Sequence, residues 1–159
     1  MGTTHSDSDR ETINFEMENL KQVCAVIDMQ GYILHKNFYP REIAVSNEMS
    51  SIWLEVECPI KRSFLKNTKC EMGYRFQKEY IHGIPLDSIR GKLGLKVLKP
   101  ENIGNVIRKI YNKVKTAEKD HLACKNQQVS EILAQYGIPH INLEYLTVEG
   151  ERCPKLHAR

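Results

Sequence analysis

We predict the fold from one segment, VCAVIDMQGYILHKNFYPREIAV, which covers residues 23–45. It begins with the apolar run VCAVID, which is typical of a strand that is covered on both faces. MQGY then supplies a turn, in which Gly31 can adopt a positive φ. YILHKNF and REIAVS extend the sheet, with an interruption near Pro40. Two carboxylates, Asp28 and Glu42, stand inside this apolar pattern and need an explanation.

The remaining elements follow from hydrophobic spacing. SIWLEVECPI alternates apolar side chains and predicts a third strand. Apolar residues recur at helical spacing over residues 103–114 and 129–136, which predicts two helices. DHLACK and HINLEYLTV predict short strands. Residues 62–97 have no firm period and predict a long irregular loop, a feature that is usually functional or mobile in a compact domain.

These elements together predict an α/β fold with a mixed sheet flanked by helices. The first three strands are expected to be antiparallel and the later strands parallel. We expect residues 1–12 to form a disordered lead, because their Ser, Thr, Asp and Gly residues offer nothing to bury. Residues 13–159 are expected to form a single domain, and whether further residues complete it at the C-terminal end stays open.

Composition restricts the class of protein only loosely. The chain has 159 residues, of which 41% are hydrophobic, enough for one core. Its formal charge of +3 permits a nucleic-acid partner without requiring one. We expect no membrane segment, since no apolar run approaches the roughly 20 residues that a spanning helix needs. Five scattered cysteines and no apparent secretory signal favour a reducing compartment, the cytoplasm or the nucleus.

Basic residues gather in the span from residue 90 to residue 115, where Glu101 is the one acid. This span predicts a surface that follows nucleic-acid phosphates, although a charged helix face is often only a solvated face. The predicted nucleic-acid-binding residues are Arg90, Lys92, Lys96, Lys99, Arg108, Lys109, Lys113 and Lys115. Three preceding aromatics could stack unpaired bases or close the core: Tyr74, Phe76 and Tyr80.

The order of the predicted elements resembles the ribonuclease H-like fold, and within it the DnaQ-type 3′–5′ exonucleases. These enzymes hold two Mg²⁺ ions with four acids, the first two in a D-x-E motif on the first strand. Asp28 matches the first acid, but Gln30 stands in place of the second. In KNQQVS, Asn126 matches a motif residue, whereas Ser130 stands in place of the third acid. The resemblance therefore implies the scaffold without the two-metal centre.

A closer resemblance is to the Maelstrom domain, a ribonuclease H-like domain of the germline small-RNA (piRNA) pathway. Three short motifs carry this resemblance, EIAVS, HGIP and ACKNQQVSEIL, and it extends over roughly residues 22–157. In that family the glutamate of the second strand joins a later Cys-x2-His-x8-Cys cluster in a zinc site. Glu42 matches this glutamate, but nothing here matches the Cys, His and Cys.

Each candidate site residue also has a structural interpretation. Asp28 is either a strand-end carboxylate that accepts backbone N–H groups or a residual metal- or phosphate-binding group. Glu42 needs a partner because an unpaired buried charge is costly, and Arg41, Lys36, another nearby lysine or zinc could serve. His82 is either a loop histidine without a task or a nucleic-acid contact.

Two sequence pairs have the spacing of zinc ligands, His121-x2-Cys124 and Cys153-x3-His157. Against the first pair, residues three apart on a strand point to opposite faces. Cys24 and Cys124 lie in apolar runs and are also consistent with small core side chains.

The function that we predict is a catalytically degenerate nuclease-like domain that binds RNA, partner proteins or both in a small-RNA silencing pathway. One alternative is an active Mg²⁺- or Mn²⁺-dependent nuclease that uses Asp28, Glu42 and one of Asp120 or Glu144. The other is an adaptor that binds only proteins. Exposed apolar surface would allow homo-oligomers.

Overall fold

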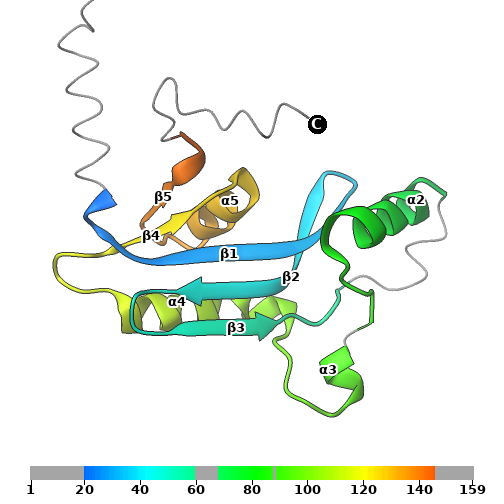
Figure 1. The fold of residues 1–159 in the computed structure, drawn as a ribbon, viewed down its shortest axis with the longest axis horizontal. Coiled ribbons are helices and arrows are strands. Elements are labelled where there is room, and N and C mark those ends of the chain that lie inside the picture. The colour runs from blue at the N-terminus through cyan, green and yellow to red at the C-terminus, as the bar shows by residue number, and fades with distance from the viewer. Residues whose placement is uncertain (1–19, 60–67, 88, 146–159) are drawn as a thin grey trace, which may run out of the picture. The chain divides into compact units, whose positions relative to one another are not determined.

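A computed structural model describes residues 20–59, 68–87 and 89–145 of the chain (Figure 1). The strands are β1 (Val23–Leu34), β2 (Asn37–Ser46), β3 (Ser51–Glu55), β4 (His121–Cys124) and β5 (His140–Asn142). The α-helices are α2 (Thr68–Gln77), α3 (Ile89–Lys92), α4 (Ile103–Val114) and α5 (Gln127–Gln135). A π-helical turn covers Lys78–His82, and short 3₁₀ helices cover Pro100–Asn102 and Leu143–Tyr145.

The five strands form one mixed sheet in the order β3-β2-β1-β4-β5. β2 and β3 are antiparallel, whereas β4 is parallel to β1 and β5 is parallel to β4. The predicted α/β class with a mixed sheet is therefore confirmed. The third strand, both periodic helices and the two short later strands are confirmed as well. Residues 1–12, the predicted lead, lie outside the described residues.

The chain divides into two compact units at residue 26 and again at residue 114. One unit runs over residues 27–114 and contains most of β1, together with β2, β3, α2, α3 and α4. The other unit contains the start of β1, together with β4, α5 and β5. In this second unit Asn126 caps α5, since its Oδ1 accepts the N–H of Val129 at 2.9 Å. Gly137 follows α5 with a φ of 66°, the left-handed conformation that ends helices.

The side chains of β1 alternate between a buried and an exposed face, which explains how the strand accommodates Asp28. Ala25, Ile27 and Met29 are buried, whereas Val26 is 45% exposed and Asp28 is exposed. The prediction of a strand covered on both faces was therefore wrong, because a run of apolar letters hid a period of two. Asp28 belongs to the open face, where a carboxylate has no burial cost.

The turn between β1 and β2 lies five residues later than the predicted turn MQGY. His35 and Lys36 form it, with φ values of 49° and 66°, as a two-residue hairpin turn of the I′ kind requires. Gly31 lies inside β1, where an added Cβ would overlap the backbone of Tyr39 and Pro40. Gly31 therefore allows a close backbone approach instead of a turn, and β2 continues through Pro40 without the predicted interruption.

The predicted irregular loop at residues 62–97 contains regular structure. α2 and the π-helical turn follow one another, and α3 comes before the segment that reaches α4. Their hydrophobic pattern escaped recognition because α2 and the π turn leave large apolar side chains exposed, among them Met72, Phe76 and Tyr80. Residues 60–67 and 88 of this span lie outside the described residues.

A buried arginine connects the sheet to the loop that follows the π turn. Arg41 on β2 is only 1% exposed. Its Nε donates to the carbonyl of Val56 at 3.0 Å, and its Nη1 donates to the carbonyl of Pro85 at 2.9 Å. These bonds satisfy a charge that would otherwise be costly to bury. Arg41 is therefore a structural residue.

Two tyrosine side chains also form hydrogen bonds with this loop. The hydroxyl of Tyr32 donates to the carbonyl of Ile84, and the hydroxyl of Tyr74 accepts the N–H of Leu86 at 3.1 Å. Tyr32 and Leu86 also belong to one buried apolar cluster, against which Tyr74 packs. The HGIP motif, residues 82–85, is thus fixed by side chains from β1 and β2, and Tyr74 of α2 fixes the residue that follows it.

Replacing Gly31 by Ala is expected to destabilise the protein by about 2 kcal/mol or more, because a backbone overlap forces two strands apart. Urea denaturation followed by circular dichroism measures the change. Gly73→Ala is the matched control. Gly73 lies within α2, and its added Cβ would make an ordinary contact with Leu34, so this variant should be as stable or up to about 1 kcal/mol more stable. Equal stability of Gly31→Ala and the parent chain would contradict the close-approach explanation.

Arg41→Ala is expected to cost about 3 kcal/mol in the same assay. The variant leaves the carbonyls of Val56 and Pro85 without this donor and opens a cavity. Lys96→Ala, which removes an exposed cation of the same unit, should change the free energy of unfolding by less than about 0.5 kcal/mol. A similar small effect for both variants would show that Arg41 is not structural.

Candidate nucleic-acid interface

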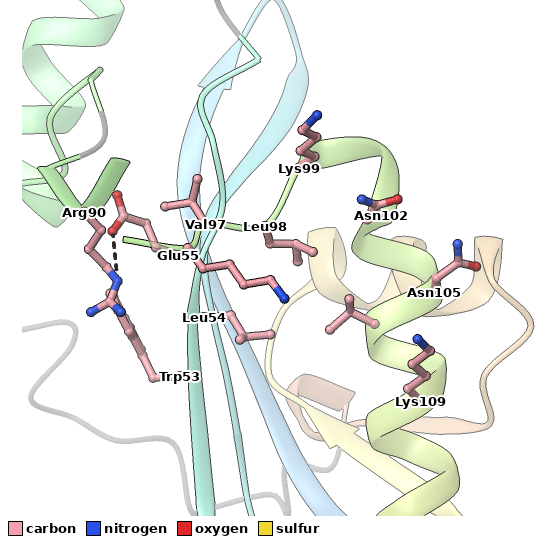
Figure 2. A pocket seen from close by; sticks show the side chains of 12 residues that line it. Trp53, Leu54, Glu55, Arg90, Val97, Leu98, Lys99, Asn102, Asn105 and Lys109 are labelled. Carbon is pink, nitrogen blue, oxygen red and sulfur yellow. Dashed lines mark ion pairs between the residues drawn. The ribbon is translucent and has the colours of Figure 1, made fainter. Parts of the chain in front are cut away.

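A pocket of about 750 Å³ opens within the unit formed by residues 27–114 (Figure 2). Its lining comes from β3, the stretch from Lys96 to Lys99 and the exposed side of α4, together with Arg90 of α3 and Asn102 of the 3₁₀ helix before α4. Its charged lining consists of four cations and one carboxylate: Arg90, Lys96, Lys99, Lys109 and Glu55. Two amides, Asn102 and Asn105, add hydrogen-bonding groups, and Trp53 is the aromatic side chain of the lining.

The amphipathic pattern of α4 determines one wall of this pocket. Ile103, Ile107 and Ile110 are buried, so the opposite side of the helix faces outward. Asn105 and Lys109 lie on that outward side, and Asn102, the last residue of the 3₁₀ helix before α4, lies beyond them in the same direction, as Figure 2 shows. These residues together present amides and an ammonium group to the pocket.

The opposite wall contains a close arrangement of three side chains. The guanidinium carbon of Arg90 lies 5.7 Å from the ring centroid of Trp53, within cation–π distance. Nε of Arg90 lies 3.9 Å from Oε2 of Glu55, whose side chain is only 12% exposed (Figure 2). Because Arg90 itself is exposed and this ion pair is long, the contact contributes little to stability.

The predicted basic residues are only partly gathered at this pocket. Four of the eight line it, namely Arg90, Lys96, Lys99 and Lys109. Lys113 follows Lys109 by one turn on the same side of α4, whereas Arg108 lies on another side and Lys115 follows the helix. Lys92 belongs to α3, but its side chain lies outside the described part of the structure.

The predicted stacking aromatics lie outside the lining of this pocket. Tyr74 packs against the core cluster, which agrees with the core alternative. Phe76 and Tyr80 are exposed and contact each other, with ring centroids 5.4 Å apart. Trp53 was missed, although a signal existed. The alternation of Ile52, Leu54 and Val56 already placed Trp53 on the other face of its strand.

The two candidate carboxylates lie on neighbouring strands, and neither belongs to a metal-binding cluster of described residues. Oδ1 of Asp28 accepts the N–H of Met29 at 2.9 Å, as the structural interpretation expected, although inside a strand and not at its end. Glu42 lies opposite Glu55 in the β2–β3 register. Arg41, a proposed partner of Glu42, points to the buried side instead. Within the described residues no cluster of three or more His, Cys, Asp or Glu side chains could hold a metal ion.

The sequence pairs with zinc-ligand spacing also have other roles where they are described. Nδ1 of His121 lies 2.7 Å from Oδ1 of Asp120. Cys124 is buried, and burial raises the pKa of its thiol, so it is a poor source of thiolate. Burial also raises the pKa of Cys24, whose thiol donates to the carbonyl of His121 at 3.2 Å. Cys153 and His157 lie outside the described residues.

A serine–histidine contact in the unit that contains α5 was not foreseen from the sequence. Nδ1 of His140 lies 2.8 Å from the carbonyl of Ile138 and therefore carries the proton. Nε2 is then the acceptor for the hydroxyl of Ser130, 2.9 Å away. This pair joins α5 to β5 and satisfies both side chains, so we assign it a structural role.

His82 is held as a neutral imidazole beside the buried arginine. Its Nδ1 accepts the N–H of Ile84 at 2.9 Å, and its ring meets Tyr32 edge to face at 4.5 Å. Its Nε2 is buried and has no hydrogen-bond partner among the described residues. Burial lowers the pKa of His82 below its usual 6.5, and the positive charge of Arg41 lowers it further.

The lowered pKa of His82 predicts that the protein loses stability on mild acidification. The unfolded chain takes up this proton near pH 6.5 and the folded chain only at lower pH, so stability is full above that value and falls as the pH decreases below it. Melting temperatures measured between pH 7.5 and pH 5 should fall less steeply for His82→Gln than for the parent. His35→Gln, which changes an exposed turn residue, should keep the parent slope. Parallel slopes for all three proteins would exclude His82 as the cause.

Comparison with known proteins identifies no relative for this chain. No protein-family model, curated protein or solved structure matches it. In the part of the chain that the structure describes, no helix has the length and apolarity needed to span a membrane.

Proposed function

We propose that this chain is a ribonuclease H-like domain that binds RNA through the pocket between β3 and α4. The observation that carries the proposal is the lining of that pocket, where four cations and a half-exposed indole occur together. Lysine and arginine bind phosphates with release of counterions, and an aromatic ring stacks unpaired bases. A pocket that offers both groups suits a single strand, which presents phosphates and free bases, better than a ligand that presents negative charges alone.

The topology of the sheet supports the ribonuclease H-like part of this proposal. A hairpin of long strands comes first, a third antiparallel strand follows, and β4 and β5 then add in parallel on the other side of β1. The domain works by binding and not by exonuclease chemistry, because the acids of that chemistry are replaced at Gln30 and Ser130. The resemblance to Maelstrom supports a place in a small-RNA silencing pathway, in the cytoplasm, the nucleus or both.

One observation favours the adaptor alternative as a second role. Met72, Phe76 and Tyr80 recur every four residues along α2 and the π turn, and all three are exposed. Such an apolar stripe is typical of a surface that another protein covers. This role is compatible with RNA binding, because none of the three residues lines the pocket.

Reversing two charges of the pocket should weaken RNA binding and its dependence on salt. We expect Lys99→Glu/Lys109→Glu to bind a labelled 12-nucleotide single-stranded RNA at least tenfold more weakly, in fluorescence anisotropy at 50 and 200 mM salt. The slope of log affinity against log salt should become shallower by about 1.5, since each phosphate contact to a single strand contributes about 0.7.

A second double variant, Lys36→Glu/Lys119→Glu, is the control for net charge. It makes the same change in total charge at exposed positions outside the pocket and should bind within about threefold of the parent. Equal losses in both variants would reduce the interaction to nonspecific charge attraction. Cleavage of the labelled RNA in the presence of Mg²⁺ or Mn²⁺, abolished by Asp28→Asn, would favour the nuclease alternative instead.

A further inference from the structure

Trp53 is an unusual residue for its position. It lies on β3, at the edge of the sheet, and it is 49% exposed. It is also the only tryptophan of the chain. An indole buries a large apolar area when it is covered, so a half-exposed indole inside a pocket offers a contact surface for a ligand. That surface is the flat face of the indole ring.

The neighbours of Trp53 select a planar ligand with an adjacent negative charge. The guanidinium of Arg90 lies beside the indole, within cation–π distance. A flat base that stacks on the exposed part of the ring would therefore place its own phosphate near a permanent cation. The ion pair between Glu55 and Arg90 is long and Arg90 is exposed, so Arg90 can turn toward that phosphate at little cost.

The far wall of the pocket suits neighbouring parts of the same strand. Lys99 and Lys109 supply ammonium groups for phosphates further along it, and Asn102 and Asn105 supply amide groups that can hydrogen-bond a sugar or a base edge (Figure 2). A volume of about 750 Å³ falls within the range of small-molecule sites, about 300–1,000 Å³. A single strand can offer a free base face to the indole, whereas in a duplex both faces of each base are already stacked.

We propose that the pocket is a subsite for a single strand in which one unpaired base stacks on Trp53 and the phosphate beside that base binds Arg90, while Lys99 and Lys109 across the pocket bind phosphates further along the strand. This inference rests on the proposed RNA-binding function and adds to it the residue that recognises a base. It makes single-stranded nucleic acid the preferred ligand over duplexes of the same sequence.

The single tryptophan allows a direct test, because stacking of a base quenches indole fluorescence. The purified chain is titrated with an octamer of adenylate, with the same octamer annealed to its complement, and with an abasic ribose-phosphate octamer. We expect saturable quenching by the single strand, at least tenfold weaker binding of the duplex, and little quenching by the abasic strand. Anisotropy of labelled octamers measures binding independently of the quenching.

Variants at position 53 complete the test. Trp53→Ala should bind the adenylate octamer about tenfold more weakly and keep the salt slope of the parent, since it removes stacking and no charge. Trp53→Phe should recover most of the affinity, because it restores a flat ring. Circular dichroism confirms the fold of each variant.

The outcomes separate this subsite from RNA binding itself. If the octamer binds by anisotropy with a normal salt slope but leaves the fluorescence unchanged, or if Trp53→Ala binds as tightly as the parent, the subsite is overturned and RNA binding stands. Equal affinity for the abasic and adenylate strands would overturn it as well. If no octamer binds at all, both proposals fail together.

Discussion

The guanidinium of Arg41 connects β2 to two later segments of the chain through buried hydrogen bonds. Its two acceptors lie 15 and 44 residues away along the chain, at the end of β3 and in the loop after the π turn. An arginine suits this task because its donors form a rigid fork and its charge strengthens each bond in a buried setting. The main-chain carbonyl of Arg41 accepts the N–H of Val56 at 2.8 Å, so two hydrogen bonds join Arg41 to Val56 beyond the last paired residue of the β2–β3 ladder.

The stretch from Lys96 to Lys99, which lines the pocket, depends on this connection. Val56 forms a parallel bridge with Leu98, and the N–H of Leu98 donates to the carbonyl of Glu55 at 2.8 Å. The stretch that contains Lys96 and Lys99 is therefore attached to the end of β3, directly beyond the point where Arg41 holds the strand. An interaction in the core thus determines where cations stand at the surface, which is a common way for a rigid scaffold to position binding residues.

The sequence predicted the elements whose signal is local and missed those decided by distant contacts. The helix at residues 103–114 was predictable because its apolar residues repeat over three turns, and β4 because its run is short and apolar. The turn at His35 and Lys36 was missed because two residues other than glycine adopt positive φ there. Arg41 could not be predicted as buried, since sequence patterns assign arginine to the surface. Half of the predicted basic residues line the pocket. The strand alternation placed Trp53 on the face opposite Leu54, but its contact with Arg90, 37 residues away in the sequence, carries no local signal.

Both atoms that Arg41 binds are main-chain carbonyl oxygens, which every amino acid possesses. Substitutions at the two acceptor positions can therefore preserve the bonds, as long as the backbone keeps its path. At the donor position no other residue offers the same fork, and even lysine would supply a single point of attachment. Substitutions are therefore tolerated at positions 56 and 85 and restricted at position 41, so most of this constraint falls on one residue of the sequence.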